Sequence, residues 1–186
     1  MKAKIPYNKA YNLAQRILKE LEPGCSRIEI RGSLHRKKPM VGDIEILAIP
    51  KIKNMQLDFF GNASGIDTKL DDIITRLVSV EKRLMIYKNG KKYKNLLLPK
   101  ANVQLDLFLT DSLCWPIISA IRTGSSLFSK KIVTQQNKGG FLNNSFSING
   151  GRLIDGAATP VALESELHFF KDYLSCGWVR PQEREL

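Results

Sequence analysis

The stretch that decides the fold covers residues 31–47 and reads RGSLHRKKPMVGDIEIL. The alternation over residues 43–47 predicts a strand whose isoleucines point into a core, while Asp43 and Glu45 share the opposite face. Along a strand these two carboxylates lie roughly 6–7 Å apart at the backbone. They can therefore converge on one or two divalent cations, and Mg²⁺ prefers carboxylate ligands combined with phosphate oxygens.

The residues before this strand predict an anion-binding turn. Residues 27–31 alternate as a strand does and stop at Gly32-Ser33, where a helical turn is expected to follow. Such a turn presents unpaired backbone N–H groups to an anion, and Gly32 lets a phosphate approach the backbone closely. Ser33 and Arg36 would lie on one side of the turn, so a hydroxyl and a guanidinium would serve the same anion.

A third acid, Asp106, lies in a strand predicted over residues 103–109. Together with Asp43 and Glu45 it would complete a metal cage. Each feature alone has an ordinary interpretation, since Gly-Ser turns are common and alternating acids usually form a solvated face. Their order and spacing together favour metal-dependent nucleotidyl transfer, in which one part holds a triphosphate and the other polarises it.

Composition sets the broad class of the protein. The 186 residues include 29 Lys+Arg and 18 Asp+Glu, so 29 − 18 gives a net charge of +11, which favours a polyanionic partner. No apolar run approaches the roughly 20 residues of a membrane span, and the N-terminus lacks the apolar stretch of a secretory signal. The three cysteines have no metal-type spacing. We expect a protein that is not secreted and has no membrane partner, located in a bacterial, phage-infected or viral-factory cytoplasm.

The remaining periodicities predict an α+β protein with a change of character near residue 111. Residues 1–111 would form one domain and residues 112–186 a second, smaller one. Strands are expected over residues 27–31, 44–49 and 103–109, with a hairpin over 83–98 that turns at Asn89-Gly90. Helices are expected over residues 7–22, 68–80, 116–122, 126–136 and 163–174.

At these residues the sequence resembles the polymerase β-like nucleotidyltransferases, and in particular the family X DNA polymerases. The shared pattern is a Gly-Ser turn, an acid-x-acid strand about ten residues later and a third acid on a later strand. Two further segments are similar: Arg122–Lys130, which contains a Thr-Gly-Ser turn, and the closing residues 169–185. The resemblance implies a palm with a mixed or antiparallel sheet and helices on one face, followed by a small α/β, thumb-like C-terminal subdomain.

The resemblance also implies roles for individual residues. Asp43, Glu45 and Asp106 would hold two Mg²⁺ ions, with Mn²⁺ as an alternative, and Asp106 would help to deprotonate the primer 3′-hydroxyl. The nucleotide-binding set would be Gly32, Ser33, Arg36, Gly42, Thr123, Gly124 and Ser125. The implied partners are a deoxynucleoside triphosphate and DNA as a primer-template or gapped duplex, bound by a monomer. The implied activity is template-directed DNA synthesis by two-metal-ion transfer, which fills short gaps in DNA repair.

This sequence departs from the family pattern at two positions. Glu45 stands where Asp is usual, and Ile121-Arg122 replaces two aromatic residues that often precede the Thr-Gly-Ser turn. The first departure affects metal preference, and the second affects selection of deoxyribose over ribose. The short N-terminal part leaves no room for a lyase domain, so that activity is not expected.

Two groups of basic residues are candidates for DNA binding. Residues 82–100 contain seven Lys or Arg, no Asp or Glu, and two interleaved tyrosines. Such a hairpin can follow a phosphate backbone, although a solvated lysine-rich surface gives the same pattern. The candidates are Lys88, Lys91, Lys92 and Lys94 here, and Lys130, Lys131 and Lys138 after the Thr-Gly-Ser turn.

Two other functions fit the same residues. One is a nucleotidyltransferase that needs no template or modifies another acceptor. The other is a nucleic-acid-binding module whose catalytic site has decayed. Incorporation opposite each of the four templating bases separates a polymerase from a template-independent transferase, and nucleotide binding separates both enzymes from the decayed module.

Overall fold

The computed structural model describes residues 4–57 and 63–186. The chain forms two compact units, one of Met1–Ile30 with Pro39–Leu109 and the other of Arg31–Lys38 with Thr110–Leu186. The boundary that begins the long C-terminal part of the second unit falls after Leu109, whereas the sequence predicted it after residue 111. Residues 31–38 were expected in the first domain but cluster with the second unit. Both units mix helices and strands, so the expected α+β class is confirmed.

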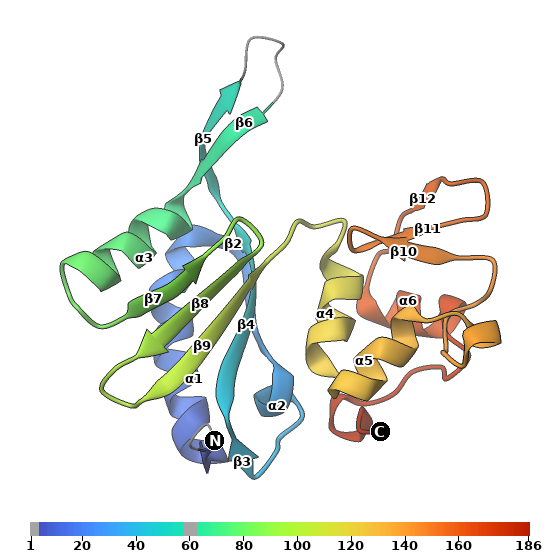
Figure 1. Ribbon diagram of the computed structural model, residues 1–186, viewed down its shortest axis with the longest axis horizontal. Helices are drawn as coiled ribbons and strands as arrows, with labels where there is room; N and C mark the ends of the chain where they lie inside the picture. The colour runs from blue at the N-terminus through green and yellow to red at the C-terminus, as the bar shows by residue number, and fades with distance from the viewer. Residues whose placement is uncertain (1–3, 58–62) are drawn as a thin grey trace. The chain divides into compact units, whose positions relative to one another are not determined.

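A five-stranded mixed sheet organises the first unit (Figure 1). Its strand order is β2-β4-β9-β8-β7, in which β4 and β9 pair in parallel, whereas the β9–β8 and β8–β7 pairs are antiparallel. The strands are β2 (Cys25–Arg31), β4 (Asp43–Pro50), β7 (Met85–Asn89), β8 (Tyr93–Leu98) and β9 (Val103–Leu109).

One face of this sheet forms the core with two helices. Ile44 and Ile46 of β4 are fully buried, as are Leu105 and Leu107 of β9. The helix α1 (Tyr7–Leu21) contacts β4 and passes behind the sheet in Figure 1. The helix α3 (Lys69–Ser79) packs beside α1, and its Asp71 pairs with Lys94 of β8. Each helix buries one stripe of apolar residues, and Thr68 caps α3 by accepting a hydrogen bond from the Asp71 N–H.

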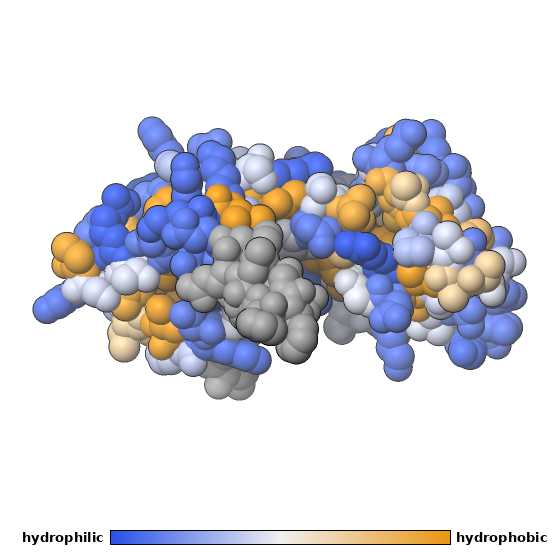
Figure 2. All heavy atoms as spheres, turned by 90° about the horizontal axis from the view of Figure 1, so that it is seen from above, coloured by the Kyte–Doolittle hydropathy of each residue, from blue (hydrophilic) through white to orange (hydrophobic). Residues whose placement is uncertain are grey.

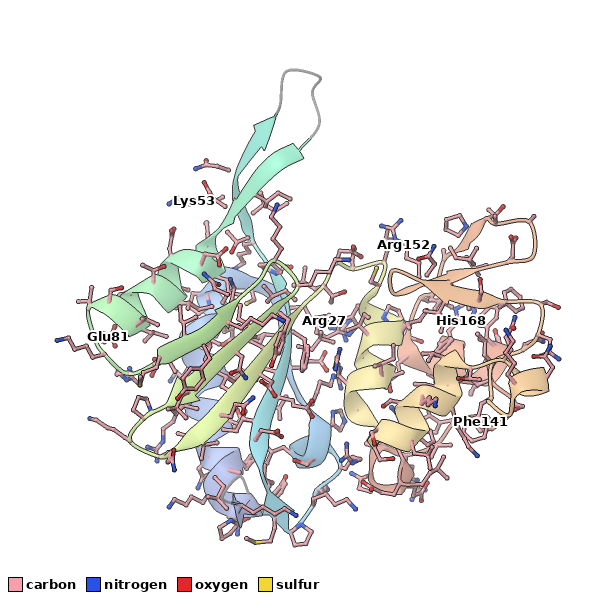
Figure 3. The ribbon with its side chains drawn as sticks, in the orientation of Figure 1. Arg27, Lys53, Glu81, Phe141, Arg152 and His168 are labelled. Carbon is pink, nitrogen blue, oxygen red and sulfur yellow. The ribbon has the colours of Figure 1, made fainter. Side chains whose placement is uncertain are left out.

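The first unit also contains short elements that the sequence did not predict. β1 (Ile5–Pro6) pairs with β3 (Met40–Val41), and β5 (Ile52–Leu57) pairs with β6 (Ala63–Thr68). A 3₁₀ turn, η1 (Glu22–Gly24), follows α1. Lys53 of β5, labelled in Figure 3, forms an ion pair of 2.8 Å with Asp72 of α3.

The second unit packs helices against a small three-stranded antiparallel sheet. Its core combines α4, α5 and α6 through residues such as Ile117, Phe128, Leu153, Phe169 and Phe170, all of which are buried. Its elements are α2 (Gly32–His35), α4 (Trp115–Thr123), α5 (Ser126–Val133), η2 (Gln136–Lys138), β10 (Ser147–Asn149), β11 (Arg152–Ile154), β12 (Pro160–Val161), α6 (Glu166–Tyr173) and η3 (Pro181–Glu183).

The surfaces agree with the basic, polar composition. Hydrophilic side chains dominate the face that Figure 2 shows, with smaller apolar areas among them. Among the residues that the structure describes, no helix combines the length and the apolar character that crossing a membrane requires.

Candidate functional site

The three candidate acids share one face of the first unit's sheet. Because β4 and β9 pair in parallel, Glu45 lies opposite Asp106 and Asp43 lies opposite Gln104. Neighbouring strands are about 4.8 Å apart, so the carboxylates of Glu45 and Asp106 start from adjacent backbone positions. All four side chains are half-buried, in contrast to the fully buried isoleucines on the other face. We call these four residues the acidic face.

Asp106 is held by a set of uncharged donors. Its Oδ1 accepts hydrogen bonds from Tyr93 Oη at 2.7 Å, Asn95 Nδ2 at 2.5 Å and Gln104 Nε2 at 2.8 Å. Tyr93 is itself fixed by stacking on Phe108, with ring centroids 5.1 Å apart. These hydrogen bonds all go to Oδ1 and come from neutral groups, so they orient the carboxylate, and within the part of the chain that the structure describes no cation pairs with it.

The acidic face has suitable donors for Mg²⁺ but no assembled metal cage. Carboxylate oxygens from adjacent strands are the ligand type that Mg²⁺ takes. Within residues 4–57 and 63–186, however, no group of three or more His, Cys, Asp or Glu side chains is arranged to hold a metal ion. The residue types and the shared face suit the expected ion, whereas the described side chains do not form such a group.

The Gly-Ser turn forms the short helix α2 of the second unit. Gly32 has a φ of 64°, a conformation that glycine adopts without strain. The turn then closes through the N–H groups of Arg36 and Lys38, which donate to Gly32 O at 3.1 Å and Ser33 O at 3.0 Å. Ser33 Oγ is buried and has no hydrogen-bond partner among the described residues. An unsatisfied buried hydroxyl is costly, so this group is a candidate ligand contact.

Arg36 connects this turn to the Thr-Gly-Ser turn. Its Nη1 donates to the carbonyl oxygens of Thr123 at 2.7 Å and Gly124 at 3.0 Å. Its Nε lies 2.5 Å from Glu185 Oε1, and Lys38 Nζ lies 3.1 Å from the same oxygen. Two segments that are far apart in the sequence, both predicted to bind a nucleotide, thus meet at one guanidinium. Arg36, Lys38 and Glu185 form what we call the basic clasp.

The basic clasp changes the acidity of its carboxylate. Burial opposes the charge of Glu185, but hydrogen bonds and attraction from Lys38 and Arg36 outweigh this effect and lower the pKa of Glu185 below its ordinary value. Glu185 therefore stays charged at neutral pH, and one carboxylate partly neutralises two cations.

The side chains of the Thr-Gly-Ser turn serve the fold. Thr123 is buried, and its hydroxyl donates to Ser119 O at 2.8 Å. Ser125 Oγ accepts from the N–H of Phe128 at 3.3 Å and so caps α5. A Cβ at Gly124 would come within 2.7 Å of the Phe128 ring. Both hydroxyls are therefore engaged inside the unit, and the prediction that Thr123, Gly124 and Ser125 bind a nucleotide stays a prediction.

Gly42 has room around it. A Cβ at this position would meet nothing within 4 Å. Packing therefore does not require glycine here, and the open space is consistent with a ligand approaching the backbone beside Asp43.

The candidate DNA-binding lysines fall into different environments. Lys94 shares a face with the buried Leu96 and Leu98, is only 5% exposed, and pairs with Asp71 of α3 at 2.7 Å. It is therefore wrong as a DNA contact. The half-buried Lys131 lies 5.3 Å from the ring centre of Phe141, which is labelled in Figure 3. The exposed candidates are Lys88, Lys91, Lys92, Lys130 and Lys138.

Several residues of these two clusters were not predicted as site residues. Tyr93 and Asn95 reach Asp106 through the register of β8 against β9, whereas Gln104 precedes Asp106 by two residues on the same strand. Lys38 and Glu185 meet across a long stretch of sequence. The alternation of side chains along a strand is a sequence signal that places Gln104 on the same face as Asp106, and the same alternation on β8 applies to Asn95. No local pattern indicates the Lys38–Glu185 pair.

Comparison with known proteins adds no family assignment. A scan against protein-family models and a search of curated proteins both gave no match.

Proposed function

We propose that this protein is a nucleotidyltransferase of the family X DNA polymerase type, which adds deoxynucleotides to a primer 3′-hydroxyl and fills short gaps. The observation that carries the proposal is the acidic face: Asp43, Glu45 and Asp106 lie on one side of adjacent parallel strands. This arrangement follows, along the chain, a Gly-Ser turn whose Arg36 already binds a carboxylate.

The reaction requires a positioned acceptor for one proton. In the proposed step the primer 3′-oxygen forms a bond to the α-phosphorus, the bond from that phosphorus to the pyrophosphate oxygen breaks, and the hydroxyl proton goes to a base. Asp106 suits this role, because three donors fix its Oδ1 and its other oxygen receives no hydrogen bond from the described residues. Positioning by such hydrogen bonds supplies part of the rate enhancement.

Metal binding, phosphate binding and DNA contacts are the other functions that the proposed reaction requires. Mg²⁺ held by Asp43, Glu45 and Asp106 would supply charge neutralisation at the transferring phosphoryl group. In the second unit, Arg36 and Lys38 would bind the β- and γ-phosphates, since guanidinium and ammonium groups both bind phosphate oxygens. In the first unit, the open backbone at Gly42 would allow a phosphate to approach beside Asp43. The exposed lysines of the β7–β8 hairpin and of the α5 region would contact the DNA backbone.

Primer extension on a gapped duplex with Mg²⁺ tests this proposal. The wild-type protein should incorporate the complementary deoxynucleotide opposite each of the four templating bases and release pyrophosphate. Incorporation of the same nucleotide opposite every template would instead indicate a template-independent transferase. If the protein incorporated no nucleotide and calorimetry showed no nucleotide binding, both enzyme functions would be contradicted. The nucleic-acid-binding module would then be the remaining function.

A further inference from the structure

The basic turn of the second unit already holds an anion that belongs to the protein. The segment Arg31–Lys38 contains four Lys or Arg and no Asp or Glu. Glu185, near the C-terminus, supplies a carboxylate oxygen that lies 2.5 Å from Arg36 Nε and 3.1 Å from Lys38 Nζ. A phosphate oxygen makes the same kind of contact with a guanidinium and an ammonium group.

The guanidinium does not depend on Glu185 for its position. Arg36 Nη1 donates to the carbonyls of Thr123 and Gly124, and its side chain is only 13% exposed. These contacts keep Arg36 in place when the carboxylate leaves. An oxygen of another anion can then replace the Glu185 oxygen at Nε without any rearrangement of the arginine.

The C-terminal segment also stays in place if only the Glu185 side chain moves. Ser125 N–H donates to Arg184 O at 2.9 Å, and the Arg184 side chain is fully buried. Its guanidinium pairs with Glu166 and lies 4.4 Å from the ring centre of Phe170. The Glu185 side chain, in contrast, is 37% exposed. Rotation of one half-exposed side chain is therefore enough to open the basic clasp.

We propose that Glu185 is an internal competitor for polyphosphate, which occupies Arg36 and Lys38 in the free protein and is displaced when the phosphates of a nucleotide bind. The inference rests on the proposed function for the identity of the natural ligand. It assigns to Glu185 the control of phosphate affinity at this turn. Binding then exchanges one anion for another, so the two cations are never left uncompensated.

The test measures the affinity of inorganic tripolyphosphate, without metal or nucleic acid, by calorimetry at fixed ionic strength. Glu185→Gln should bind about fivefold more tightly than wild type, because an exposed ion pair worth roughly 1 kcal/mol no longer competes. Glu164→Gln is the matched control, since it removes the same charge from an exposed position of the same unit. Its affinity should stay within about twofold of wild type.

A second pair of variants shows whether the gain is local. In a Lys38→Gln background, where one of the two cations is already absent, Glu185→Gln should increase the affinity by a smaller factor. Equal affinities of wild type and Glu185→Gln, or an equal gain in Glu164→Gln, would overturn the proposal. If tripolyphosphate bound neither the wild type nor any variant, the proposal would also be overturned. Primer extension by the wild-type protein would show separately whether the proposed function stands.

Discussion

The two candidate clusters treat charge in opposite ways. On the acidic face, Asp106 accepts hydrogen bonds from Tyr93, Asn95 and Gln104, all of which are neutral. In the basic clasp, Arg36 and Lys38 share a carboxylate of the same unit. In the first cluster neutral donors orient the Asp106 carboxylate, whereas in the second a carboxylate partly neutralises two cations.

This difference indicates how each cluster would meet a ligand. A carboxylate that is oriented by neutral donors keeps its attraction for a cation. A pair of cations that is already compensated binds an anion only by exchange, and this exchange weakens the affinity. The acidic face is therefore suited to a cation and to proton transfer, and the basic clasp is suited to reversible binding of phosphates.

The largest expected effect concerns stability. Glu166 is the carboxylate partner of the fully buried Arg184 and also accepts a hydrogen bond from Ser119. Glu166→Gln should lower the free energy of unfolding by about 3 kcal/mol, because it leaves a buried cation without its counter-charge. Asp106→Asn should change it by less than about 1 kcal/mol, since its partners are neutral. Urea denaturation of both variants measures the difference, and equal losses would contradict the comparison.

The next effect concerns orientation of Asp106. Tyr93→Phe removes one hydrogen bond to the carboxylate but keeps the stacking on Phe108. We expect kcat for nucleotide incorporation to fall about 10-fold, which corresponds to about 1.4 kcal/mol, with little change in the KM for nucleotide. Tyr87→Phe is the matched control, because Tyr87 is 63% exposed on the same hairpin. If both variants had wild-type kcat, Tyr93 would not position Asp106.

The smallest effect concerns the approach of phosphates to Gly42. Gly42→Ala should fold normally, because a Cβ there meets nothing within 4 Å. A bound phosphate close to this backbone would meet the added methyl group, so the KM for nucleotide should rise about threefold, worth roughly 0.7 kcal/mol. Gly156→Ala serves as the control, because a Cβ at this exposed position would make only an ordinary contact, 3.8 Å from Ser145 O. An unchanged KM in Gly42→Ala would place the phosphates elsewhere.

Most of the fold could be predicted from periodicity alone. The alternation over residues 43–47 predicted a buried face with Ile44 and Ile46, and both are fully buried. The β5–β6 hairpin was missed because it lacks this signal: Ile52 and Ile66 are 56% and 47% exposed, and the pairing contains register shifts. Strands that bury little apolar surface leave no hydrophobic pattern to detect.

The site was only partly predictable, for two physical reasons. The charge of Lys94 predicts a basic surface residue. Lys94 is, however, two and four residues before Leu96 and Leu98, so it lies on the same buried face of the strand, where it pairs with Asp71. The clasp between Arg36 and Glu185 joins residues 149 positions apart. Local patterns carry no information about such a contact, because it depends on how the whole second unit packs.

The most direct test of the central claim compares two acid-to-amide substitutions in single-nucleotide gap filling with Mg²⁺. Asp43→Asn alters the acidic face, and Asp67→Asn makes the same change at an exposed position of β6. The account predicts that Asp43→Asn lowers the incorporation rate about 100-fold or more, while Asp67→Asn remains close to wild type. Equal incorporation by the two variants would contradict the claim that the acidic face carries the chemistry.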